Sequence, residues 1–287
     1  MVVGGQTVKL TGHVYVIPDR RVSLVPNVGI VVGDQGVLVI DTGMGPANAE
    51  IVLAEVRKIT DLPIKYLVST HFHPEHYFGA QSFPEDTIII ISTAERRDLD
   101  NKGEAYREWF LDLFGDDVAD LLAPVSIVPP DVTFETKAEF NLGNLPVELY
   151  HFGHAAHTTG DTVVYLPGEK VLFAGGLTPN RFFPIFPDED SSVDGWLALL
   201  DELARFDVEQ VVPGHGEVGD RALIANVKRY LLELKEAALG LKADGVTLAD
   251  AQAQLAPRFE SEHDDWGEPF WINNAVAEIY AEADSNP

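Results

Sequence analysis

The sequence predicts an α/β fold in which two similar βα halves pack face to face as an αββα sandwich. The main observation is a repeated order: a hairpin, a helix, a short apolar strand and a histidine-bearing loop follow one another twice along the chain. The length of 287 residues and the 46% content of hydrophobic residues also suit one sizeable core. Because open sheets bind ligands beyond their strand ends, we expect the two histidine loops to meet at one edge of the sandwich.

The first half begins with two β-branched runs, 28–32 and 37–40, which the turn sequence Gly-Asp-Gln-Gly joins as a hairpin. Pro46 suits the first turn of a following helix, and apolar residues recur at helical spacing as far as Ile59. A short buried strand, 66–68, comes next, and His71 opens the loop that follows it.

The second half repeats this order. Two apolar runs, 163–166 and 171–174, flank a Pro-Gly-Glu turn, and a helix is expected over 193–205. A short strand at 211–212 then leads into a Pro-Gly-His-Gly loop that carries His215. The correspondence is one of pattern rather than of identity, and it indicates two related structural units.

The remaining segments are predicted to be helical. Residues 93–122 contain four apolar candidates for a core or a pocket, and packing is the expected role: Trp109, Phe110, Leu113 and Phe114. The chain from Asp220 onwards shows Ala- and Leu-rich helical periodicity. No segment has the composition of a linker, so we expect a single domain over residues 1–287.

Composition excludes several functions. The net charge is −26, with 46 acidic against 20 basic residues, and a surface this negative repels nucleic acid. No apolar run approaches the roughly 20 residues that span a bilayer, so no membrane partner is expected. The first ten residues lack the pattern of a signal peptide, which leaves a cytoplasmic protein or a mature periplasmic form. The sequence does not indicate an oligomeric state.

The string Thr-His-Phe-His-Pro-Glu-His at 70–76 is the strongest functional signal. Imidazole and carboxylate are the usual ligands of a catalytic zinc ion, and without any cysteine a metal must be bound by nitrogen and oxygen. His71 and His73 alternate, so both point the same way from an extended backbone and can reach one metal ion. Glu75 and His76, beyond Pro74, can turn toward a second ion.

This string resembles the His-x-His-x-Asp-His signature of the metallo-β-lactamase superfamily, with Glu75 in place of the aspartate. Three further motifs follow the family's order. The strand ending in Asp41 resembles the first motif, His157-Thr-Thr-Gly-Asp the third, and Pro-Gly-His215-Gly the last. The resemblance implies a metallo-β-lactamase-like sandwich in which one zinc ion binds three histidines and a second binds a carboxylate and two histidines. The first set is His71, His73 and His157, and the second set is Glu75, His76 and His215.

The resemblance also implies a mechanism and roles for two carboxylates. In this family a metal-bound hydroxide attacks a carbonyl-type carbon, and zinc lowers the pKa of its water to about 7 from about 15.7. Glu75 can bind a metal or move a proton, and Asp41 supports the metal site by orienting its ligands. Gly176 stands where the family carries an aspartate that bridges both ions. We therefore expect at least one zinc, weaker binding of a second, and a gain of metal on Gly176→Asp.

The expected reaction is hydrolysis of a small amide or ester, with a β-lactam as one substrate. Lactones, thioesters, phosphoesters and sulfate esters remain alternatives because the fold hosts all of them. His and carboxylate ligands also suit a single iron, so an oxidoreductase stays open, as does a degenerate metal-binding protein.

Three other features have two interpretations each. The aromatic stretch 178–186 with Arg181 predicts either a pocket wall that grips an anion or a buried loop. Tyr77 either donates to an oxyanion or packs, and His154 is either a substrate contact or a local packing residue. The acidic string 188–190 is a candidate replacement for the bridging aspartate.

Overall fold

The hairpin of the first half forms where the turn sequence predicts it. In the computed structural model, which describes residues 1–187 and 190–285, β3 (Val28–Gly33) pairs antiparallel with β4 (Gly36–Ile40). Helix α1 (Gly45–Ile59) follows, and β5 (Ile64–Val68) returns parallel to β4. The second half repeats this path with β10 (Val163–Leu166), β11 (Val171–Gly175), α5 (Val193–Leu203) and β12 (Gln210–Pro213). The repeat that the sequence predicts is therefore present in the structure.

Each half belongs to a mixed sheet. The first sheet has the strand order β1-β2-β3-β4-β5-β6-β7, and it is antiparallel as far as β4 and parallel from β4 to β7. The second sheet has the order β12-β11-β10-β9-β8, with only β11 and β12 parallel. The strands not yet given are β1 (Val8–Lys9), β2 (Val14–Ile17), β6 (Ile88–Ser92), β7 (Val132–Phe134), β8 (Lys137–Asn141) and β9 (Pro146–Tyr150).

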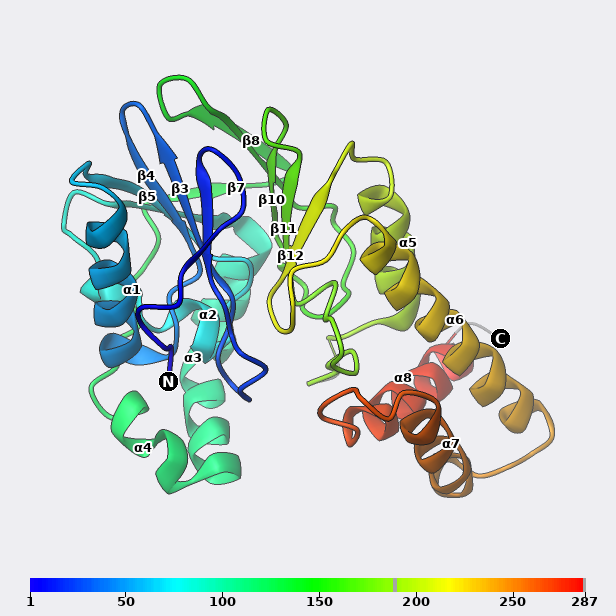
Figure 1. Ribbon diagram of the computed structural model, residues 1–287. Helices are drawn as coiled ribbons and strands as arrows, with labels where there is room; N and C mark the ends of the chain where they lie inside the picture. Colours follow the sequence, from blue (N-terminus) through cyan, green and yellow to red (C-terminus); the bar gives the residue numbers. More distant parts are fainter. Residues whose placement is uncertain (188–189, 286–287) are drawn as a thin grey trace.

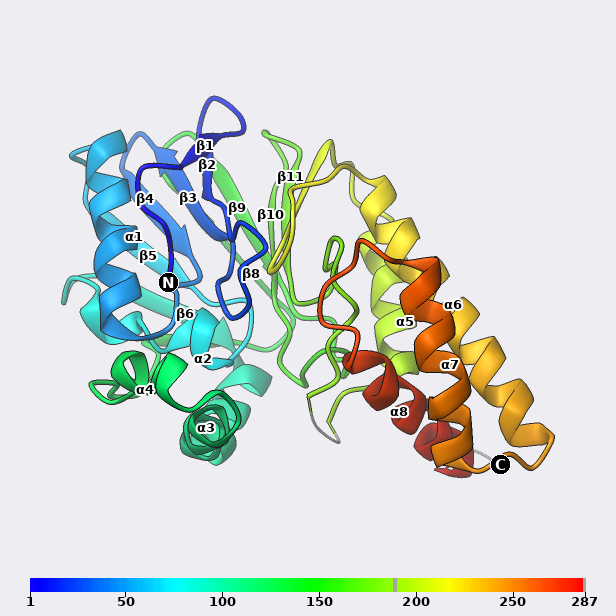
Figure 2. The same cartoon turned by 60° about the horizontal axis from the view of Figure 1, so that its bottom comes forward.

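The two sheets face each other, and helices cover their outer sides (Figure 1). Helix α1 lies on the outer side of the first sheet, and the α3 region lies below it (Figures 1 and 2). Helix α5 covers the second sheet, α6 and α8 pack against α5, and α7 packs against α6 and α8. The other helices are α2 (Pro74–Tyr77), η1 (Ala80–Ser82), α3 (Thr93–Phe114), α4 (Asp116–Leu122), α6 (Ala222–Ala243), α7 (Leu248–Glu262) and α8 (Trp271–Ser285).

The side-chain alternation of β4 explains the layers. Val37 and Val39 point into the core between the first sheet and its helices, whereas Leu38 and Ile40 point into the core between the sheets. All four side chains are buried, and full burial of one such side chain contributes roughly 1.5–3 kcal/mol. A strand that is apolar on both faces is therefore stable only in the middle of a layered structure.

The predicted helical stretch 93–122 divides into α3 and α4 at Gly115. This residue has a φ of +54°, a left-handed conformation that glycine adopts without steric cost, and it ends α3. Within the described residues, no helix is both long enough and apolar enough to cross a membrane.

Candidate metal centre

The backbone around residues 70–77 separates the motif into two pairs of side chains. Strand β5 ends at Val68, so His71 and His73 lie on the loop that follows it. Pro74 then occupies the first turn of the short helix α2, where its missing N–H is not needed. Glu75 and His76 lie on this helical turn and project in a different direction from the loop residues.

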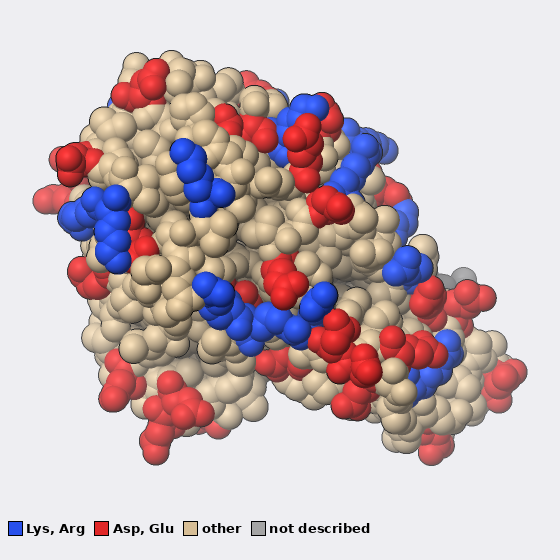
Figure 3. All heavy atoms as spheres, viewed as in Figure 1, with Lys and Arg blue, Asp and Glu red and all other residues tan. Residues whose placement is uncertain are grey.

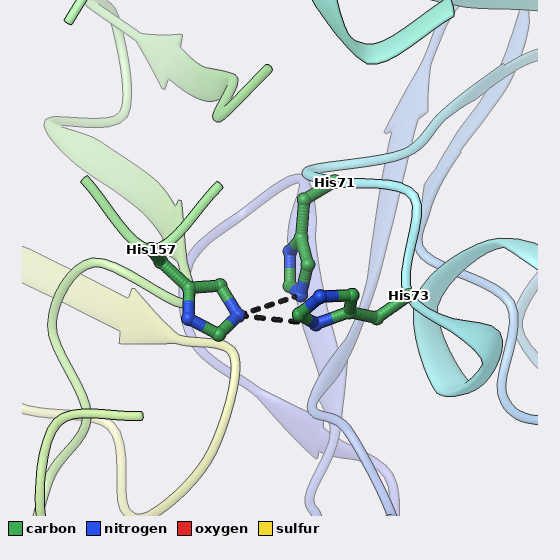
Figure 4. Close-up of side chains that lie close together, drawn as sticks. All are labelled: His71, His73 and His157. Atoms are coloured by element: carbon green, nitrogen blue, oxygen red, sulfur yellow. Dashed lines mark hydrogen bonds between the residues drawn. The ribbon is translucent and has the colours of Figure 1, made fainter. Parts of the chain in front are cut away.

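The structure brings His71, His73 and His157 together in a first cluster. Nε2 of His157 lies 3.2 Å from Nε2 of His71 and 3.2 Å from Nδ1 of His73 (Figure 4). His157 comes from the loop before β10, more than 80 residues away in the sequence. All three residues are buried, and one ring nitrogen of each lies within 4.8 Å of the others.

Glu75, His76 and His215 form a second cluster. Nε2 of His76 lies 3.3 Å from Nε2 of His215, which in turn lies 3.7 Å from Oε1 of Glu75. His215 follows β12 in the second half, so both halves contribute to each cluster. All three side chains are buried, and one donor atom of each again lies within 4.8 Å of the others.

Hydrogen bonds from Nδ1, on the side of each ring that faces away from the clusters, orient His76, His157 and His215. A carbonyl oxygen only accepts, so Nδ1 of His157 donates to Ile185 O at 2.8 Å and Nδ1 of His215 donates to Val25 O at 3.1 Å. Nδ1 of His76 donates to the Asp41 carboxylate at 2.8 Å. In the neutral form of each ring, Nε2 therefore carries the lone pair that a metal ion would bind; when Nε2 of His215 carries a proton instead, it donates to Glu75. The donor set fits a bound metal ion.

Asp41 holds the two parts of the motif together from behind. It ends β4 with a left-handed φ of +64°, an uncommon conformation for this residue type. Its Oδ1 accepts from the Thr70 backbone N–H at 2.8 Å, and its Oδ2 accepts from the Thr70 hydroxyl at 3.0 Å and from His76. The Thr70 hydroxyl also lies 3.1 Å from Nδ1 of His71. Asp41 therefore orients His71 and His76, which is a positioning role rather than a contact with the pocket.

Burial keeps the three histidines of the first cluster in the form that binds metal. Desolvation lowers the pKa of His71 and His73 well below the usual value, and it lowers that of His157 to about 4. These imidazoles are neutral at pH 7. Burial alone would favour the neutral acid of Glu75, but the hydrogen bond from His215 and the nearby histidines lower its pKa to about 2. Glu75 is therefore an ionised carboxylate.

A second buried carboxyl group, Glu95 at the start of α3, lies behind this region. Burial raises its pKa well above the usual value, Ser69 offsets only part of the shift, and the charges of Asp41, Asp161 and Asp98 raise it further. Because the pKa of Glu95 is higher in the folded than in the unfolded state, its contribution to stability is fully present below the unfolded pKa. That contribution is lost as the pH rises through the folded pKa.

Glu95→Gln is therefore expected to raise the free energy of unfolding at pH 8, because an amide needs no proton to remain neutral. The gain should shrink by up to about 1.4 kcal/mol for each pH unit on acidification and vanish near pH 4. Denaturant unfolding of both proteins across this pH range measures it. Parallel pH profiles would contradict a protonated Glu95 in the native state.

A pocket opens above the two clusters. Its floor includes His73, Glu75, His157 and His215, and its space measures about 580 Å³ including the open mouth. The other lining residues are mostly apolar: Ser23, Leu24, Trp109, Phe110, Phe114, Phe182, Ile185, Pro187, Glu268, Phe270 and Trp271. The sequence did not indicate Ser23, Leu24, Glu268, Phe270 or Trp271. They lie in loops or, for Trp271, at the start of α8, and none is part of a local motif, so only the fold brings them to the site.

The structure shows where three residues with two possible roles lie. The Tyr77 hydroxyl donates to Val128 O at 3.0 Å, so Tyr77 packs and does not face an oxyanion. Arg181 is exposed and pairs with Glu217 and Asp265, and it does not line the pocket, so it does not grip an anion there. His154 is exposed.

The aromatic stretch divides its side chains between the two expected roles. Phe182 lines the pocket, whereas Phe183 and Phe186 belong to the core around α5 to α8. Of the helix candidates, Trp109, Phe110 and Phe114 line the pocket, and Leu113 is exposed. Residues 188–189 of the acidic string lie outside the described residues, and Asp190 pairs with Lys102.

Gly176 lies against the first cluster, but not with room for a side chain. A Cβ built on Gly176 would lie 2.3 Å from Cδ2 and 2.8 Å from Cγ of His157. Real Cβ atoms essentially never approach this closely. A side chain at Gly176 would therefore collide with the His157 ring in this arrangement, which argues against the expectation that Gly176→Asp adds a bridging ligand.

The comparison with known families agrees with this arrangement. The sequence model of the metallo-beta-lactamase superfamily matches residues 23–215. This chain belongs to that superfamily. The matched region contains both clusters and ends at His215, before α6. The superfamily relatives are metal-dependent hydrolases in general, which places this chain among such proteins.

Curated relatives in the superfamily have two different activities. A metallo-beta-lactamase type 2 of Bacteroides fragilis is 28% identical over 212 residues, 72% of this chain and 76% of the relative. A linear primary-alkylsulfatase of Pseudomonas sp. is 28% identical over 227 residues, 68% of this chain. This chain spans only 42% of that alkylsulfatase.

Solved structures show the same fold. A metallo-beta-lactamase from Pontibacter korlensis superposes with a TM-score of 0.65 at 24% identity, covering 79% of this chain and 98% of its own. A sec-alkylsulfatase from Pseudomonas sp. superposes with a TM-score of 0.75 at 18% identity, covering 96% of this chain and 50% of its own. The second match extends into α6, α7 and α8, because only 4% of this chain remains outside it.

Proposed function

We propose that this protein is a metal-dependent hydrolase that cleaves a small ester or amide bound in the pocket above the two clusters. The observation that supports it is the convergence of Nε2 of His76 and Nε2 of His215, 3.3 Å apart beside Glu75, with Glu75 and His215 in the pocket floor. His71, His73 and His157 would hold one ion, and Glu75, His76 and His215 would hold another. A zinc ion bound there lowers the pKa of a coordinated water to about 7 and polarises the scissile bond.

The chain's own residues supply orientation and a proton acceptor. Oε2 of Glu75 is buried without a hydrogen-bond partner within the described part of the chain, so it is available to an ion or to a proton. Asp41 and the carbonyl groups of Val25 and Ile185 keep the histidine lone pairs directed inward. The apolar wall excludes water from the side of the pocket opposite the clusters.

Two substrate classes compete within this proposal. A β-lactam is an amide of suitable size, and beta-lactamase relatives are 26–28% identical to this chain. A sulfate ester is the second candidate, because an alkylsulfatase relative is 28% identical and an alkylsulfatase fold matches α6 to α8 as well. Zinc is the expected ion, and iron suits the same ligands.

Metal removal tests the proposal. Treatment with a strong chelator should abolish turnover, and added Zn²⁺ should restore it, because the proposed mechanism depends on a metal ion to lower the pKa of the attacking water. We would measure metal per chain by elemental analysis and test turnover of a chromogenic cephalosporin, 4-nitrophenyl acetate and dodecyl sulfate. Turnover that persists after chelation, in protein that retains less than roughly 0.1 metal ion per chain, would contradict a metal-dependent hydrolase.

A further inference from the structure

The wall of the pocket has a charge pattern that the hydrolytic chemistry does not require. Aromatic side chains surround the space from three separate parts of the chain: Trp109, Phe110, Phe114, Phe182, Phe270 and Trp271. We call them the aromatic wall. Apart from the histidines, the charged residues that line the pocket are Glu75 and Glu268, and among the described residues no Lys or Arg lines it.

Glu268 is held over the pocket by its loop. It lies between α7 and α8 with a left-handed φ of +64°. The preceding residue, Gly267, donates its N–H to Arg181 O at 2.8 Å and accepts from Phe183 N at 3.1 Å. Backbone strain that the surrounding structure maintains is typical of functional positions.

The Glu268 carboxylate has no internal partner to neutralise it. It is partly buried, and within the described residues it forms no ion pair and no side-chain hydrogen bond. Two cations lie near this part of the chain, and neither lines the pocket. Arg181 pairs with Glu217 and Asp265. Arg21 lies over the Phe182 ring and donates to the backbone carbonyl groups of Arg181 and Asp265.

A carboxylate beside aromatic faces is a binding site for an organic cation. Aromatic rings attract an ammonium group through their quadrupole, and a nearby carboxylate adds a charge of opposite sign. The net charge of −26 favours the approach of cations to the molecule as a whole, and the face in Figure 3 carries acidic side chains together with a band of Lys and Arg across its middle. An anionic tail would instead meet Glu268 without a compensating cation.

We infer that the pocket selects small esters that carry an ammonium group, and that Glu268 is the residue that determines this selectivity. The ammonium group lies against the aromatic wall beside Glu268, and the ester lies over the two clusters. This inference rests on the proposed hydrolytic function and names its substrate class. Hydrolysis adds one water across the ester C–O bond, and it yields the carboxylic acid and the alcohol without any redox partner.

The test compares two esters of the same shape and different charge, acetylcholine and 3,3-dimethylbutyl acetate. With zinc-loaded protein we expect kcat/KM to favour the cationic ester by about tenfold, which corresponds to about 1.4 kcal/mol. Glu268→Gln should remove most of this preference, measured as the ratio of the two kcat/KM values. Glu260→Gln, at an exposed position on α7, is the matched control with the same change of charge.

A binding measurement separates this inference from the hydrolytic proposal. Trp109 and Trp271 line the pocket, so tryptophan fluorescence should respond to choline more strongly than to its neutral isostere 3,3-dimethylbutan-1-ol. If Glu268→Gln weakens choline binding, the inference is supported. If in addition neither ester is cleaved, ester hydrolysis is contradicted, but the selectivity for an ammonium group is still supported. Equal binding of the two alcohols, or an unchanged preference in Glu268→Gln, would overturn the inference and leave the metal-dependent hydrolase standing.

Discussion

Replacing His73 with alanine is expected to remove about one metal ion per chain and to lower kcat/KM for an accepted ester by about 10³-fold or more. His73 supplies Nδ1, which lies 3.2 Å from Nε2 of His157, and its ring stacks on Tyr106 with the ring centroids 4.9 Å apart. Two remaining imidazoles bind an ion more weakly than three do. Loss of a catalytic metal ion removes several kcal/mol of transition-state stabilisation, and each 1.36 kcal/mol is a factor of ten.

The measurement combines elemental analysis with steady-state kinetics on zinc-loaded proteins. His154→Ala is the matched control, because His154 is an exposed histidine only three residues before His157. It should keep both metal content and turnover. Circular dichroism and the unfolding midpoint show whether His73→Ala remains folded. Unchanged metal content and kcat/KM in a folded His73→Ala protein would separate the histidine string from catalysis.

The fold could be predicted because its signals are local. The runs 28–32 and 37–40 are rich in β-branched residues, and only a short glycine-containing turn separates them. A hairpin can therefore be predicted from neighbouring residues alone. The order of elements in the two halves then predicted the sandwich, although no register between the sheets could be derived. Four of the six cluster residues carry a local signal as well, because His71, His73, Glu75 and His76 lie within six positions. The other two, His157 and His215, were assigned through the resemblance to the family.

The pocket wall could not be predicted because it is assembled from distant loops. Glu268 and Trp271 lie more than 50 residues after His215, in a stretch whose pattern indicates only helices. They reach the site because Gly267 bridges to the backbone of residues 181–183. Arg181 is the reverse case, a residue that the sequence suggested for the pocket and that the structure places outside it. Its aromatic neighbours suggested a grip on an anion, but its charge is directed to Glu217 and Asp265.

Gly176 shows how a motif can mislead when the space around it is unknown. The family's pattern places an aspartate at this position, so its absence suggested a missing ligand. The structure instead places the His157 ring where a side chain would begin, with Cδ2 only 2.3 Å from a built Cβ. The backbone N–H of His157 donates to Asp161, which fixes the backbone of the loop, and the ring cannot rotate aside without losing its Nδ1 bond to Ile185 O.

Gly176→Asp is therefore expected to lower metal content and to reduce metal affinity by at least about 10- to 100-fold, the loss typical of disturbed ligand orientation. Gly176→Ala is the matched variant, because it introduces the same Cβ without a carboxylate. If steric displacement of His157 is the cause, both variants should lose metal from the first cluster to a similar degree, as measured by zinc titration against a fluorescent chelator. A gain of metal in Gly176→Asp with a loss in Gly176→Ala would mean that the new carboxylate takes the place of His157 as a ligand. That outcome would show that the loop before β10 adapts to a larger residue, and it would refute the rigid arrangement from which the loss is predicted.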